Sequence, residues 1–145
     1  MQRKLSQEWL DRVAGFVFSG DVDAFVDHFS LPLAILSDTQ ASTIETRDGL
    51  IEKFRAWQNM FAALAVTSME RTVRDVIDFG PTRIVAQYGS DVLSRGQRVM
   101  PRFESVLVLE LQGTTWRCSE IVTGLGAADR HLIHANETDG RRAAE

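Results

Sequence analysis

The chain has 145 residues, of which 44% are apolar and 25% are charged, and this length and composition are typical of one globular domain. Its formal net charge of −4 argues against non-specific binding to a phosphate backbone, so we expect no nucleic-acid partner. The only cysteine, Cys118, excludes an internal disulfide, and the longest apolar run, at residues 60–66, is too short to cross a bilayer. We therefore expect a cytoplasmic protein with no membrane partner.

Three helices are predicted before residue 67. Ser6 is a suitable N-cap for the first helix and Gly20 a suitable end for it. Asp21 caps a short second helix, and Thr46 begins a third. In each of them apolar residues recur three and four positions apart, which indicates that one face of the helix is buried.

Strands account for most of the remaining sequence. Two short ones are predicted between the second and third helices, at residues 33–37 and 41–45. Turn-forming residues separate the longer runs that follow, so neighbouring runs are expected to pair antiparallel. These β-branched, aromatic and alternating runs cover residues 67–79, 83–94, 98–111 and 115–123.

This order of elements predicts an α+β fold in which three N-terminal helices cap one face of a curved antiparallel sheet. Strands of such length bend, often through a bulge. A strongly curved sheet under helices encloses an apolar hollow, which is the kind of place where proteins bind small molecules.

Several short motifs occur in an order typical of one superfamily. They lead into and out of the second helix, open the third helix, mark the first long hairpin and close the last one. The motifs are Gly20-Asp21-Val22-Asp23-Ala24-Phe25, Phe29-x-x-Pro32, Arg47-Asp48-Gly49-Leu50-Ile51, Phe79-Gly80 with Ile84-Val85-Ala86, and Leu107-Val108-Leu109 followed by Gly113, Trp116-Arg117 and Ile121.

With these motifs the chain resembles the nuclear transport factor 2-like superfamily, in its SnoaL-like branch, over residues 6–123. The resemblance implies a cone-shaped, cystatin-like roll that often forms a homodimer through the sheet. It implies no single activity, because the superfamily includes isomerases, dehydratases, cyclases, epoxide hydrolases, binding modules and assembly domains. We expect one pocket domain over residues 1–124 and a partly disordered tail over residues 125–145.

Acid–base chemistry in such a hollow needs a carboxylate whose pKa is raised by burial, together with a hydroxyl that can hold an oxyanion. Glu120 shares a strand face with Trp116, so both point inward if Trp116 does. Tyr88 is the only tyrosine and shares a face with apolar residues. Arg71 and Asp75 share a face of residues 67–79, unless a bulge near the centre of that strand exchanges the two faces.

Other residues are expected at the pocket for reasons of position. His28 and Asp38 follow the second helix and could overhang the mouth, and Trp57 could form a wall, although His28 also suits the helix dipole and Trp57 a solid core. No metal or cofactor is expected, because His131 and His134 have no further ligands nearby in sequence. The complete expected ligand pocket consists of Arg71, His28, Asp38, Trp57, Phe103 and Trp116.

The sequence favours a small-molecule-binding domain, paired as a homodimer, with no assigned reaction. The first alternative is an acid–base enzyme of isomerase, dehydratase or cyclase type that acts on a small, partly apolar carbonyl compound. In it Glu120 or Asp75 is the base and Tyr88 the oxyanion donor. The second alternative is a non-catalytic assembly module whose cone is filled by side chains.

Overall fold

The computed structural model describes residues 2–124. Within them helix α1 spans Gln2–Ser19, α2 spans Val22–Asp27 and α3 spans Arg47–Ala63. Asp21 and Thr46 cap α2 and α3 as predicted, because their side chains accept hydrogen bonds from backbone amides three residues later. The expected tail at residues 125–145 lies outside the described residues.

Helix α1 begins one turn earlier than the capping pattern predicts. Ser6 is a buried residue inside the helix, and its hydroxyl donates to the Gln2 carbonyl at 2.8 Å. A serine can satisfy its hydroxyl in this way within a helix, so it does not have to mark a helix start. The additional turn contains Arg3, whose side chain lies beside the sheet.

The strands form one sheet in the order β2-β1-β7-β6-β4-β3, with β5 paired to β4. The sheet is mixed, whereas the sequence predicts a wholly antiparallel one. Strand β1 runs parallel to β7, and the other pairs are antiparallel. Hairpin turns fix only the direction of consecutive strands, and β1 is far from β7 in sequence. The strands are β1 Phe29–Leu36, β2 Ala41–Ile44, β3 Ser68–Asp78, β4 Arg83–Ser94, β5 Gln97–Arg98, β6 Phe103–Gln112 and β7 Thr115–Thr123.

The expected strand at residues 98–111 is interrupted. Residues 99–102 separate the short β5 from β6. Pro101 lies in this interruption, and a proline has no backbone N–H to donate to a sheet. The strand β6 therefore starts at Phe103, with the inward residues Leu107 and Leu109 fully buried as the alternation predicts.

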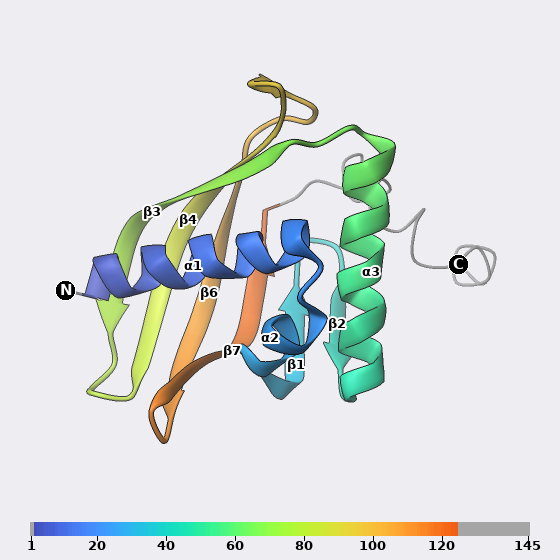
Figure 1. Ribbon diagram of the computed structural model, residues 1–145. Helices are drawn as coiled ribbons and strands as arrows, with labels where there is room; N and C mark the ends of the chain where they lie inside the picture. Colours follow the sequence, from blue (N-terminus) through green and yellow to red (C-terminus); the bar gives the residue numbers. More distant parts are fainter. Residues whose placement is uncertain (1, 125–145) are drawn as a thin grey trace.

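All three helices lie on one side of the curved sheet (Figure 1). In that view α1 crosses in front of the long strands, and α3 stands beside β1 and β2. One buried cluster joins Leu10, Leu50 and Phe54 of the helices to Ile84 and Leu109 of the sheet. The predicted α+β fold with helices on one sheet face is confirmed. None of the described helices is long and apolar enough to span a membrane.

Strands β3 and β7 each contain a bulge. In β3 the register passes from Val73 opposite Tyr88 to Asp75 opposite Gln87, which leaves Arg74 as the extra residue. In β7 the register changes around Ser119 in the same way. A single extra residue exchanges the two faces of a strand beyond it, so each bulge changes which side chains face the helices.

Candidate functional site

A cavity of about 160 Å³ lies between the helices and the inner face of the sheet. Its helical wall includes Val17 of α1, Phe25 of α2, and Leu50 and Trp57 of α3, and β1 contributes Leu33. The caps described above fix where α2 and α3 begin, and the apolar spacing of each helix turns these side chains toward the sheet. An engineered protein cavity of ~150 Å³ holds one benzene molecule, so this one has room for a small organic molecule.

Polar side chains occupy the sheet side of the cavity. Cross-strand register places Tyr88 opposite Ser105 and Ser105 opposite Thr123, while Arg71 stands opposite Ser90. The Ser105 hydroxyl donates to the Thr123 hydroxyl at 3.5 Å. Directly opposed residues on one sheet face are neighbours, so these strands gather several hydrogen-bonding groups at one end of an otherwise apolar space.

Arg71 and Tyr88 are the central pair of this polar end. The Arg71 guanidinium carbon lies 5.9 Å from the centre of the Tyr88 ring, within cation–π distance. Burial raises the pKa of Tyr88 above 10.0, although the positive charge of Arg71 opposes the rise. The tyrosine hydroxyl therefore keeps its proton at neutral pH and can donate a hydrogen bond to a ligand.

The cavity is cationic. Arg71 and, from α3, Lys53 line it, and no Asp or Glu is found among its lining residues within the described part of the chain. The Nε atom of Arg71 is buried and has no hydrogen-bond partner. A buried donor without a partner is unfavourable, so this N–H group is available to an acceptor in the cavity.

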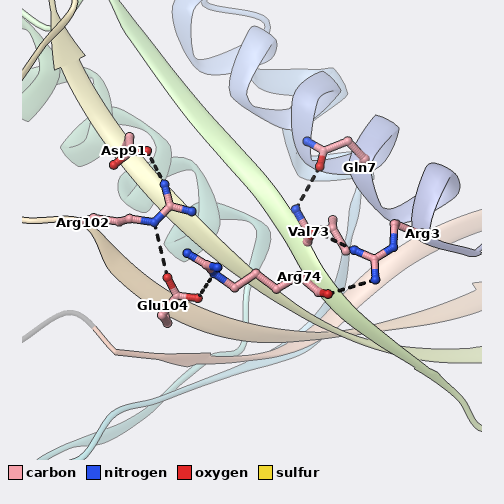
Figure 2. Close-up of polar contacts among 7 residues, drawn as sticks. All are labelled: Arg3, Gln7, Val73, Arg74, Asp91, Arg102 and Glu104. Atoms are coloured by element: carbon pink, nitrogen blue, oxygen red, sulfur yellow. Dashed lines mark hydrogen bonds and ion pairs between the residues drawn. The ribbon is translucent and has the colours of Figure 1, made fainter.

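Helix α1 fixes the backbone of β3 at this point. Gln7 donates to the Arg71 carbonyl at 2.6 Å and accepts from the Val73 amide at 2.9 Å. Arg3 donates to the Val73 and Arg74 carbonyls, both at 2.9 Å, and Figure 2 shows its contacts with the strand. Because β3 is an edge strand, these side chains satisfy backbone groups that have no neighbouring strand.

The outer face of the sheet holds a network of ion pairs, most of which Figure 2 shows. Arg74, the bulge residue, pairs with Glu104 at 2.6 Å. Arg102 pairs with both Glu104 and Asp91, and Asp91 also pairs with Arg98. These acids thus neutralise arginines on the outer face, and the bulge places Arg74 in this network while Arg71 faces the cavity.

Four of the expected site residues line the cavity together, namely Arg71, Tyr88, Trp57 and Phe103. The two expected bases do not. Asp75 lies beyond the β3 bulge, is exposed, and accepts a hydrogen bond from the Val76 amide. Glu120 lies beyond the β7 bulge and is paired with Val108, so it faces away from the helices while its neighbour Ile121 lines the cavity.

His28, Asp38 and Trp116 are also absent from the cavity lining. The His28 ring lies 2.8 Å from the Ala24 carbonyl and packs against Phe16, so it closes the end of α2. Trp116 accepts a hydrogen bond at its carbonyl from the Trp9 indole, and Asp38 is exposed in the turn between β1 and β2. Helix dipole and core packing account for His28 and Trp116 without a ligand.

Other lining residues were not predicted, although the sequence contains a signal for some of them. Lys53 lies three positions after Leu50 and four before Trp57, so it shares their helix face. Ser90 and Ser105 are polar residues at inward positions of apolar strands, and both are buried. No group of three or more metal-ligating side chains occurs in residues 2–124, and His131 and His134 lie outside that range.

No protein-family model and no curated protein matches the sequence. Solved structures do match, the first being an NTF-2 like protein of unknown function from Shewanella oneidensis, 13% identical with a TM-score of 0.66, covering 86% of this chain and 99% of that one. An NTF2-like protein with a cystatin-like fold from Novosphingobium aromaticivorans is 15% identical with a TM-score of 0.63, covering 90% and 87%. A protein of unknown function with a cystatin-like fold from Nostoc punctiforme is 12% identical with a TM-score of 0.63, covering 83% and 88%. At these identities the likeness concerns the fold alone, and the SnoaL-like branch stays a prediction.

Proposed function

We propose that this chain, which has the nuclear transport factor 2-like fold, is a small-molecule-binding domain whose ligand occupies the cavity beneath the helices. The fold by itself supports many functions, so the proposal depends on the site. The observation that carries it is the cavity, with about 160 Å³ of space, a largely apolar wall and polar groups gathered at one end. Apolar surface supplies affinity, and a few placed polar groups supply orientation.

Binding is favoured over the two alternatives by the composition of the lining. General acid–base catalysis needs a titratable group within hydrogen-bond reach of the reacting atoms. Neither Asp75 nor Glu120 lines the cavity, and no other carboxylate does so among the described residues. A filled cone would favour pure assembly, but Trp57 and Phe103 border open space and do not fill it.

A titration with benzyl alcohol, a neutral ligand with one ring, tests this proposal. Backbone amide signals of the cavity-lining residues should shift in a saturable way. Ile121→Phe places a ring in the cavity and should weaken binding at least tenfold, because the ligand loses its space. Thr115→Phe, on the same strand but not at the cavity, is the matched control and should leave the affinity unchanged. No saturable shift at millimolar ligand, or equal binding by the two variants, contradicts the proposal.

The proposed assembly is a homodimer through the outer face of the sheet. Ile77 and Val122 are 52% and 38% exposed there, and Val85 and Val106 are half-buried on the same face. Because the helices lie on the other side, this apolar surface has no covering element within residues 2–124 (Figure 1). A second copy of the chain would remove it from water.

A cytoplasmic location is part of the same proposal. Cys118 is the only cysteine and is buried, so the fold makes no demand for an oxidising compartment. Fractionation of cells that produce a tagged chain tests the location. Signal in the cytoplasmic fraction supports the proposal, and signal in an extracytoplasmic fraction contradicts it.

A further inference from the structure

We propose that the ligand of the cavity is an organic acid with a small apolar body, and that Arg71 binds its carboxylate. This inference rests on the proposed binding function and names the chemical class of the ligand. It starts from the charge of the cavity, where Arg71 is a lining residue and no Asp or Glu is one within the described chain. A cationic, mostly apolar space is electrostatically matched to a single negative charge carried on a hydrophobic molecule.

Arg71 has the geometry of an anion-binding group. Its Nε atom is buried without a hydrogen-bond partner, and the guanidinium lies beside the Tyr88 ring. A guanidinium presents its N–H groups as a planar fork that matches the two oxygens of a carboxylate. A bound carboxylate would therefore satisfy the unpaired donor and also neutralise the charge.

The contrast with Arg74, three residues further along β3, supports this assignment. Arg74 faces outward and pairs with Glu104 at 2.6 Å, in the network shown in Figure 2. Arg71 faces inward and forms no ion pair with an acid within residues 2–124, because Asp75 and Glu120 lie beyond bulges that turn them outward. The same strand thus holds one arginine in an ion-pair network and another that faces a hollow.

The other lining residues indicate what the remainder of the ligand looks like. Tyr88 stands on the row next to that of Arg71, on the same face of the sheet, and its hydroxyl can donate to a second carboxylate oxygen. Phe25, Leu50 and Trp57 form the opposite, apolar wall. The arrangement therefore fits a carboxylate directed at β3 and a ring or short branched chain directed at the helices.

Three probes of the same size and different charge test the inference, with isothermal titration calorimetry as the readout. They are benzoate, benzyl alcohol and benzylamine, added to the full chain. The wild-type protein should bind benzoate at least tenfold more tightly than benzyl alcohol, and benzylamine most weakly. Equal or weaker binding of benzoate overturns the inference while leaving the proposed function in place. Failure of all three probes to bind contradicts the proposed function itself.

Variants at Arg71 and Arg74 test which of the two arginines binds the carboxylate. Arg71→Met should weaken benzoate binding at least tenfold and change benzyl alcohol binding by less than about twofold. Arg74→Met is the matched control on the outer face and should change neither. Arg71→Lys keeps the charge without the fork and should give intermediate benzoate affinity. Retained benzyl alcohol binding demonstrates that a variant is folded, so unchanged benzoate affinity in Arg71→Met overturns the assignment.

Discussion

At the scale of single residues, Arg71 is the group on which the proposed binding of an organic acid depends. Its Nε is buried without a hydrogen-bond partner, and a buried donor without a partner costs ~1–3 kcal/mol. The Met side chain retains most of the hydrocarbon stem without the charge. The Arg71→Met variant therefore allows the effect of this charge on the stability of the protein to be compared with its effect on ligand affinity.

We expect Arg71→Met to increase the free energy of unfolding by about 1 kcal/mol in the absence of ligand. The reason is that removing a buried, unsatisfied donor should outweigh the loss of the cation–π contact with Tyr88. Urea denaturation followed by circular dichroism measures this, with Arg74→Met, which loses an ion pair, as the control. A destabilised Arg71→Met protein without ligand would show that the contact of Arg71 with Tyr88 outweighs its unsatisfied donor.

Cys118 is a second residue whose burial affects stability, in this case through the pH dependence of unfolding. Burial raises the pKa of its thiol from 9.0 to about 12. Between these values the unfolded chain loses the thiol proton and the folded chain keeps it, so stability decreases as pH rises, by up to ~1.4 kcal/mol per pH unit. The raised pKa of Tyr88 acts in the same direction above pH 10.0.

The expected outcome is a steeper alkaline loss of stability in the wild-type chain than in Cys118→Ala. Urea denaturation at a series of pH values above 9.0 measures the two slopes. Because Tyr88 is present in both proteins, the difference between the slopes belongs to the thiol. Identical slopes would mean that the Cys118 thiol titrates normally in the folded protein.

At the scale of elements, periodicity and capping predict the helices and long strands well, because both depend on nearby residues. The side-chain directions are predicted only as far as the first bulge. Arg71 precedes the β3 bulge and lines the cavity, whereas Asp75 and Glu120 follow bulges and do not. A bulge depends on the partner strand and on α1, so the local sequence around Arg74 does not reveal it. The parallel pairing of β1 with β7 is hidden for the same reason.

Gln7 connects the first helix to the direction of Arg71. We expect Gln7→Ala to lower the free energy of unfolding by about 1–2 kcal/mol, because two hydrogen bonds to the β3 backbone are lost. It should also weaken benzoate binding more than benzyl alcohol binding, since the Arg71 backbone loses a support. Denaturation and calorimetry measure the two effects.

Two further variants of α1 make this test specific. Gln7→Glu keeps an acceptor for the Val73 amide but loses the donor to the Arg71 carbonyl, so it should fall between wild type and Gln7→Ala. Glu8→Ala changes the exposed neighbouring position and should have little effect. If Gln7→Ala behaves like Glu8→Ala, the helix does not hold the strand in the way described.

At the scale of the whole molecule, the helices cover one face of the sheet and leave the other to ion pairs and an apolar strip. We expect Ile77→Lys to shift the protein from dimer to monomer in sedimentation velocity, because a charge would be buried in the proposed interface. Ser19→Lys adds the same charge on the helical side and should leave the dimer intact. A wild-type protein that sediments as a monomer at micromolar concentration contradicts the proposed interface.

The central claim is that the cavity beneath the helices takes an apolar organic acid. A crystal structure of the protein with 4-bromobenzoate tests it most directly, because the anomalous signal of bromine locates the ring. We predict bromine between Leu50 and Phe25, with the carboxylate within hydrogen-bonding distance of Arg71. A cavity filled by water alone, or a carboxylate directed away from Arg71, would contradict the account.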